Sequence, residues 1–505
     1  MSTGALLRRT TRGCTALRGG RVRRLTPYQV FGLLFWLLMT LAYWRVPPCC
    51  EAGVHAAAVA RLRAGLTDTA VSPYVLAQGA LARLTGLTGW QLLRVSGPLN
   101  LLVLLTGLGR LVRVHTPRPW APVLALAFLS VLWGTRPAWG GGSLALLPLT
   151  GSLGYPSAFA LGLTLWAWAL TGARARDLRR VRYVGPSGLR SLSGYAGLGL
   201  LYGTVALVDP VTGVGAATGA VAFVAGWQRG WRGAVWGRWA LLCTVAAAAL
   251  AFGTHARVLT SSPYGSYAGP GGWAGPGGWA DLGRWAGQCW LALLGLPALW
   301  LRARRAGGPA PRGPVRPVAW RAAWRDPLVL LFPLECLALV CARLAGLLGL
   351  VLLAPQCALA VELAAERSWC GWRRALGWAA AGGVCLGFLA AQAGAVVPRS
   401  VDPVGFAQPP RWPSYDWAAR HIGPGEPVAT DAYYAVRLLP GYGIDLADGH
   451  DHRPRVRWLL LTRQERLPAE AVVVDWSRRT GEVLARLTRT GDMSPGPLVT
   501  RPVTR

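Results

Sequence analysis

The sequence predicts a mainly helical protein: a polytopic membrane bundle of about 11 transmembrane helices, followed by a small extracytoplasmic α/β domain. Composition gives the first indication, since 53% of the residues are hydrophobic and only 15% are charged. An ordinary soluble domain carries about a quarter charged residues. The second indication is a series of apolar stretches near the roughly 20 residues that a helix needs to cross a bilayer. The third is the placing of the arginines, in short runs between those stretches.

The strong basic balance, a formal net charge of +32, comes entirely from arginine because the chain has no lysine. A basic balance can indicate nucleic-acid binding. Here the arginines alternate with apolar segments, which is typical of topology control, so we expect the lipid bilayer as a partner and no nucleic acid. Lysine-free, arginine-rich usage is also typical of a high-GC bacterial genome, and it favours a bacterial plasma membrane as the location.

Residues 1–27 form a basic N-terminus that we expect to stay in the cytoplasm. The first apolar run, 28–46, is too long for a signal-peptide core and no small-residue cleavage site follows it, so it predicts an uncleaved first span. Further spans are expected at 92–111, 119–134, 154–171, 191–208, 212–228, 236–254, 284–302, 326–342, 345–362 and 374–397.

The charge of the loops supports this arrangement. Arg-rich loops are predicted inside and Arg-poor loops outside, as the positive-inside rule requires. The transmembrane domain then covers 28–397. An odd number of spans places the tail, 398–505, on the extracytoplasmic side.

Three regions depart from the pattern of simple spans. The outer loop 47–91 has apolar residues at helical spacing, which predicts helices along the membrane surface. The loop 255–283 contains the repeat AGPGGW-AGPGGW, whose Gly and Pro prevent regular structure. The tail contains helix-like text at 415–421 and the strand-like runs RVRWLLLT and AVVVDW.

Acidic residues are scarce before the tail, so Glu51 and Glu335 are notable. Glu51 opens the first outer loop four residues before His55, so the two side chains share a helical face. It is a candidate general base or metal ligand, and the alternative is a first-turn acid favoured by the helix dipole. Glu335 lies within a span, where a carboxylate is costly and often functional. The alternative is a protonated or internally paired side chain.

Four basic residues interrupt outer segments that otherwise exclude them: Arg136, His255, Arg257 and Arg343. Guanidinium groups match phosphate geometry, so these residues are candidates for binding a lipid-linked phosphate. The alternative for each is contact with lipid headgroups. In the tail, the DGHDH run has no specific metal-ligand spacing, and a solvated loop is the better interpretation.

Two stretches resemble a known superfamily. EAGVHAAAVARLRAGLTDTAVSPYVLAQGAL resembles the first outer loop of the C-type (GT-C) membrane glycosyltransferases, and YDWAARHIGPGEPVATDAYYAVRLLPGYGIDLA resembles the start of the outer domain of several bacterial members. The resemblance implies a sugar transferase that uses a polyprenyl-phosphate donor and a glycan or protein acceptor. It assigns Glu51 to acceptor activation or to binding Mg or Mn. His55 and Tyr74 lie in the same stretch and are candidate substrate-binding residues.

The chain lacks the paired acids of many GT-C members, since Glu51 has no acidic neighbour. The metal and the activity therefore stay open at this stage. The alternatives are a non-enzymatic transporter or flippase of lipid-linked precursors, with Glu335 coupling protons, and an inactive membrane scaffold.

Overall fold

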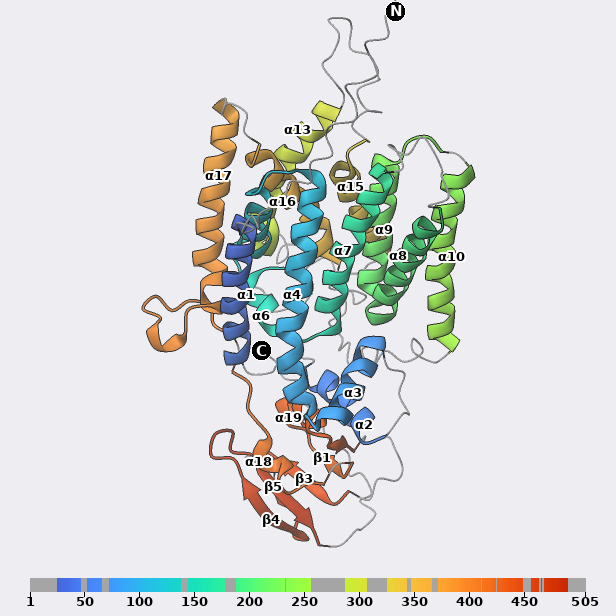
Figure 1. Ribbon diagram of the computed structural model, residues 1–505. Helices are drawn as coiled ribbons and strands as arrows, with labels where there is room; N and C mark the ends of the chain where they lie inside the picture. The colour runs from blue at the N-terminus through green and yellow to red at the C-terminus, as the bar shows by residue number, and fades with distance from the viewer. Residues whose placement is uncertain are drawn as a thin grey trace, which may run out of the picture.

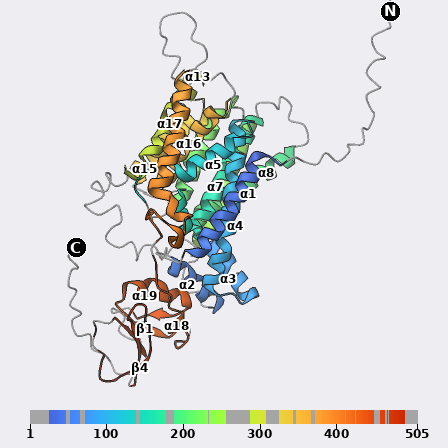
Figure 2. The ribbon, with the colours of Figure 1, turned by 90° about the vertical axis from the view of Figure 1, so that its left-hand side faces the viewer.

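The protein consists of a long helical bundle with a small mixed domain at one end, as the computed structural model shows (Figures 1 and 2). The structure describes residues 25–46, 52–65, 72–137, 144–177, 188–231, 233–255, 287–306, 325–342, 347–365, 371–409, 411–423, 425–447, 456–462, 465 and 467–488.

A helix occupies each of the predicted spans, in the predicted order. The bundle contains α1 (Pro27–Arg45), α4 (Gly89–His115), α5 (Ala121–Val131), α6 (Leu146–Ser152), α7 (Pro156–Asp177), α8 (Gly188–Val208), α9 (Pro210–Trp227), α10 (Gly233–His255), η1 (Trp290–Gly295), α13 (Leu296–Ala306), α15 (Pro327–Ala342), α16 (Leu348–Leu363) and α17 (Gly371–Gly387), which η3 (Phe388–Gln392) and η4 (Ala393–Ala395) extend.

Length and composition qualify fewer of these helices as spans. Within the described residues, 5 helices are long and apolar enough to cross a membrane, or up to 6 when the bent pair α6–α7 counts as one. Four other apolar helices are shorter than 18 residues. The multi-pass character of the chain is therefore supported, whereas the count of about 11 spans remains a prediction.

Ion pairs join several helices at the end of the bundle opposite the tail. Glu362 of α16 accepts from Arg305 of α13 and lies 3.4 Å from Arg373 of α17. Arg302 reaches Asp326, which precedes α15, at 2.6 Å. Glu362 is 7% exposed, so loss of its partners would leave a buried charge unpaired. These arginines come from the Arg-rich segments that the sequence places inside.

Two short helices, α2 (Ala52–Arg63) and α3 (Pro73–Thr85), lie at the tail end of the bundle (Figure 1). Both were expected as membrane-surface helices. The structure instead buries one face of α2 against protein, including His55, Ala56 and Val59. Only α3 keeps an apolar exposed face, with Leu81 and Leu84, so a membrane-surface position remains a prediction for α3.

The tail holds a mixed five-stranded sheet in the order β2-β1-β3-β5-β4. Strands β1 (Pro427–Ala429), β2 (Asp445–Leu446) and β3 (Trp458–Leu461) are parallel. Strands β4 (Ala471–Trp476) and β5 (Val483–Leu487) are antiparallel to their neighbours. The strands β3 and β4 occupy the two predicted strand-like runs. Short helices η5 (Arg399–Val401), α18 (Asp416–Ala419), α19 (Tyr433–Leu438) and η6 (Leu439–Tyr442) complete the domain.

Candidate active site

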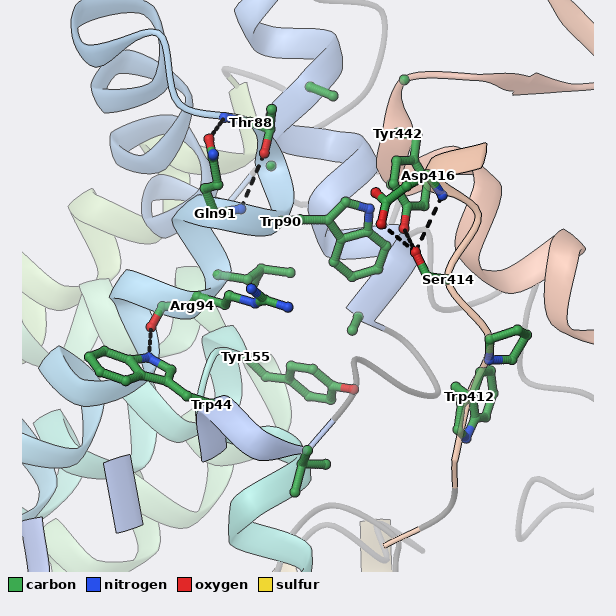
Figure 3. A pocket seen from close by; sticks show the side chains of 18 of the residues that line it. Trp44, Thr88, Trp90, Gln91, Arg94, Tyr155, Trp412, Ser414, Asp416 and Tyr442 are labelled. Carbon is green, nitrogen blue, oxygen red and sulfur yellow. Dashed lines mark hydrogen bonds between the residues drawn. The ribbon is translucent and has the colours of Figure 1, made fainter. Parts of the chain in front are cut away.

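A cavity of about 930 Å³ lies where the tail meets the helical bundle (Figure 3). Its bundle wall is made by the last residues of α1, by α2, by the first turns of α4 and by the α6–α7 junction. Its tail wall is made by residues 412–414, Asp416, Gly425, residues 441–443, Asp445 and Arg479. Such a volume fits a small-molecule or cofactor site.

The start of α4 presents Trp90 and Arg94 to the cavity (Figure 3). A capping box fixes this start: Gln91 N donates to Thr88 Oγ1 at 3.3 Å, and Thr88 N donates to Gln91 Oε1 at 2.9 Å. Trp90 and Arg94 are four residues apart, so they share one face of the helix. The positive end of the helix dipole also points into this region.

A proline inside α4 ties α1 to the site. Pro98 has no N–H, which leaves the carbonyl of Arg94 without its usual helical donor. Trp44 Nε1 donates to that carbonyl at 3.0 Å, and Tyr43 OH donates to Leu93 O at 2.9 Å. The end of α1, including Arg45, is thereby held beside Arg94 at the cavity.

The α6–α7 junction brings Tyr155 to the cavity through a 116° bend. Asn100 of α4, which is 2% exposed, satisfies the backbone of the bend: its Nδ2 donates to Leu153 O at 2.7 Å and to Tyr155 O at 3.4 Å. Asn100 also bonds the hydroxyl of Tyr74 at 2.9 Å. Burial raises the pKa of Tyr74. Tyr74 supports the bend through its hydrogen bond with Asn100, and it does not line the cavity.

Three linked polar side chains stand on the tail wall, namely Ser414, Asp416 and Tyr442 (Figure 3). The Ser414 hydroxyl donates to the Asp416 carboxylate and lies 3.4 Å from the Tyr442 hydroxyl. Burial raises the pKa of Tyr442, and the Asp416 charge raises it further. Trp412 lies beside this group and packs edge-on against Tyr434, with ring centroids 5.2 Å apart.

Two glycines allow the tail to approach the bundle closely. A Cβ at Gly441 would lie 2.4 Å from the Trp90 ring, and a Cβ at Gly53 of α2 would lie 1.7 Å from Arg437 O of α19. Neither distance is possible for a real side chain. The tail wall and the bundle wall are thus joined by close packing at Gly53 and Gly441 and by the Trp90–Tyr442 ring contact, whose centroids are 5.6 Å apart.

The cavity is cationic on its bundle side. Its described lining contains five arginines and two aspartates, namely Arg45, Arg61, Arg63, Arg94, Arg479, Asp416 and Asp445. One pair offsets part of this charge, because Arg61 lies 3.9 Å from Asp445, but both side chains are about 40% exposed and the pair is weak. Guanidinium groups gathered in a cleft of this kind favour an anionic ligand.

Of the predicted site residues that the structure describes, His55 packs against a residue that lines the cavity. Its ring packs against Tyr155, with centroids 4.8 Å apart, and it is 4% exposed. Burial lowers the pKa of His55 to about 4, so the imidazole is neutral at pH 7. Glu51 lies outside the described residues. Ala52, which follows it in the chain, lines the cavity.

The other predicted residues lie elsewhere. Arg136 is exposed beside Gly287 and does not line the cavity. Glu335 is fully buried between α15 and α9, where its Oε1 accepts from the Thr218 hydroxyl at 3.0 Å. Arg257, Arg343 and the side chain of His255 lie outside the described part of the chain. Their proposed roles stay predictions.

Within the described ranges, no three His, Cys, Asp or Glu side chains come close enough to hold a metal ion. The divalent metal that the resemblance implies is therefore a prediction that concerns Glu51.

Sequence reasoning missed the cavity arginines Arg45, Arg61, Arg63 and Arg94, and the tail group around Asp416. The arginines had a usable indication. They lie at helix ends or in short helices on the side predicted to be outer, where arginine is disfavoured. Applying the charge rule to helix ends as well as to loops would have found them. The tail group had no comparable indication in the sequence, since Tyr442 meets Ser414 and Asp416 only by packing.

Comparison with known proteins connects this architecture to a fold. No family model and no curated protein sequence matches the chain. Among solved structures, ArnT from Cupriavidus metallidurans, bound to undecaprenyl phosphate, has a TM-score of 0.51 at 16% identity, and the match covers 93% of this chain and 98% of that one. The chain has the GT-C fold.

A second structure of this GT-C group matches less closely. The archaeal oligosaccharyltransferase AglB from Archaeoglobus fulgidus, in complex with an inhibitory peptide and a dolichol-phosphate, has a TM-score of 0.48 at 12% identity, over 83% of this chain. The chain spans 64% of the length of AglB. The likeness to ArnT confirms the GT-C fold expected from the first outer loop and the tail text, and at 16% identity it concerns the fold alone.

Proposed function

We propose that this chain is a membrane glycosyltransferase that moves a sugar from a polyprenyl-phosphate donor to an extracytoplasmic acceptor, and that the cavity between bundle and tail is its active site. The observation that carries the proposal is the cationic bundle wall, where Arg45 and Arg94 flank the open space beside the start of α4. The GT-C fold agrees with it, because ArnT, which shares this fold, binds undecaprenyl phosphate.

In this proposal Arg45 and Arg94 bind the donor phosphate. Their guanidinium groups are held by the ends of α1 and α4, which the Trp44–Arg94 hydrogen bond joins. When the bond between the sugar C1 and the phosphate oxygen breaks, negative charge grows on the polyprenyl phosphate. Preorganised cations aimed at a developing charge are the strongest source of transition-state stabilisation. The arginines would therefore act on the leaving group more than on the intact donor.

Glu51 is the proposed general base. It would take the proton from the acceptor hydroxyl as that oxygen forms its bond to C1, which inverts the configuration at C1. The support is its place in the chain, directly before Ala52, which lines the cavity. The buried His55 is neutral, so it would add no positive charge to the start of α2. Binding of Mg or Mn at Glu51 remains a proposal from the resemblance. The proton transfer and the stabilisation of the leaving phosphate proposed here use protein side chains alone.

The test uses cells that depend on the chain for an outer glycan. Glu51→Gln and Arg94→Gln are each expected to abolish the glycan at normal protein level. Arg420→Gln, which changes an exposed tail arginine away from the cavity, is the matched control and should leave it intact. Unchanged glycan in the first two variants would defeat the assignment.

A further inference from the structure

The two walls of the cavity differ in chemistry. The bundle wall carries Arg45, Arg61, Arg63 and Arg94, without a described carboxylate. The described tail lining carries Asp416 and Asp445 with a single arginine, Arg479, so its formal charge is negative. A cavity that holds two substrates gains specificity when each wall suits a different one.

The tail wall is built to accept hydrogen bonds. An ionised carboxylate is an acceptor only, and Asp416 receives the Ser414 hydroxyl on Oδ2. Asp416 is exposed, so it retains capacity for further donors. The Tyr442 hydroxyl lies within the same group, 3.4 Å from both Ser414 Oγ and the backbone N of Tyr415. Such a group suits a ligand that presents several O–H donors at short spacing.

Aromatic rings frame this polar group. Trp412 is held by its edge-on contact with Tyr434, and Trp90 is held by Tyr442 across the junction of the two walls. Trp90 is partly exposed, so its held ring offers flat apolar area at little entropic cost, whereas Trp412 is 8% exposed and presents only a small part of its ring to the cavity. Ligands with both C–H faces and hydroxyl edges, such as pyranose and furanose rings, fit a wall that alternates aromatic rings with hydroxyl and carboxylate oxygens.

We propose that the tail wall around Asp416, Ser414, Tyr442 and Trp412 is the acceptor subsite, and that the acceptor is an uncharged, polyhydroxylated glycan. The assignment rests on the proposed function for the division of the cavity between donor and acceptor. A phosphorylated or otherwise anionic acceptor would bring like charge against Asp416 and Asp445. A site built to bond hydroxyls also discriminates strongly against ligands that lack them.

The test measures direct binding to the purified full-length protein in detergent. The probes are uncharged hexose and pentose tri- and tetrasaccharides, the same saccharides carrying one phosphate, and undecaprenyl phosphate. We expect at least one uncharged saccharide to bind better than its phosphorylated form. Asp416→Ala should weaken that binding about tenfold, because it removes a charge-assisted hydrogen bond. Tyr442→Phe should weaken it less. The matched control is Asp475→Ala, which removes a tail carboxylate outside the cavity.

Three results would overturn the subsite: no uncharged saccharide binds, the phosphorylated forms bind better, or Asp416→Ala binds as the wild type does. Folding of each variant is checked by its melting temperature, and Tyr442→Phe carries the test if Asp416→Ala does not fold. Undecaprenyl phosphate separates this proposal from the previous one. Loss of its binding with saccharide binding intact would count against the donor assignment, whereas the reverse would count against the acceptor subsite.

Discussion

Replacing Gly53 by alanine should push the tail away from the bundle. The added Cβ would lie 1.7 Å from the carbonyl oxygen of Arg437, and ordinary contact begins at 3.4 Å. Because the obstacle is backbone, no side-chain rotation relieves it, and α19 must shift by about the missing 1.7 Å. Overpacking of this kind costs about 1–3 kcal/mol.

The test is whether the melting temperature falls or rises when glycine is replaced by alanine. In an unobstructed helix, Gly→Ala stabilises by about 1 kcal/mol. Gly32 of α1 supplies the control, because a Cβ there meets nothing within 4 Å. We expect Gly32→Ala to melt at or above the wild-type temperature. Gly53→Ala should melt lower, and hydrogen exchange should rise in α19 and β1. If Gly53→Ala exchanged like the wild type and melted like Gly32→Ala, the described packing of tail on α2 would be wrong.

Three further predictions concern single buried side chains. Asn100→Ala should lower the free energy of unfolding of the bundle by about 2–3 kcal/mol, since it removes hydrogen bonds to the α6–α7 bend and to Tyr74. The control is Thr106→Ala, an exposed change on the same helix. If the two variants were equally stable to unfolding in detergent, this prediction would be contradicted. His55 has a folded pKa of about 4, below its ordinary 6.5, so the unfolded chain takes up the proton first as pH falls. Up to about 3 kcal/mol of stability should therefore be lost from pH 6.5 down to 4, and a pH dependence of melting equally steep in His55→Gln would refute it. Glu335 has no partner for its Oε2 within the described residues, so we expect a neutral carboxyl. Glu335→Gln should therefore leave the outer glycan unchanged. Loss of the glycan at normal protein level would instead favour the proton-coupled transporter.

Much of the fold was predictable because its elements follow from local patterns. Apolar stretches predicted the bundle helices. Arginine runs predicted the end of the bundle at which Glu362 forms its ion pairs. The strands β3 and β4 followed from runs of β-branched and aromatic residues. The number of spans did not follow as firmly. Helices such as α5 and α16 are shorter than a bilayer crossing requires, and periodicity does not reveal how such segments are placed.

The candidate site was harder to predict because it combines residues far apart in the chain. The first outer loop and the tail were singled out, and the structure packs them together through Gly53 and Arg437. The particular cavity residues were not. Arg45 is held beside Arg94 because Pro98 frees a carbonyl that Trp44 then binds, a relation that spacing alone does not show. Ser414 and Asp416 are near neighbours in the chain, but Tyr442 joins them only when α18 and η6 pack together.

Binding of undecaprenyl phosphate to the purified full-length chain shows whether the cationic wall is a donor site. We expect saturable binding that Arg45→Gln and Arg94→Gln each weaken about tenfold, since a guanidinium–phosphate contact is charge-assisted. Binding should also weaken at higher salt and stay unchanged in Arg420→Gln. If undecaprenyl phosphate did not bind, or bound equally well to all three variants, the cationic wall of the cavity would not be a donor site.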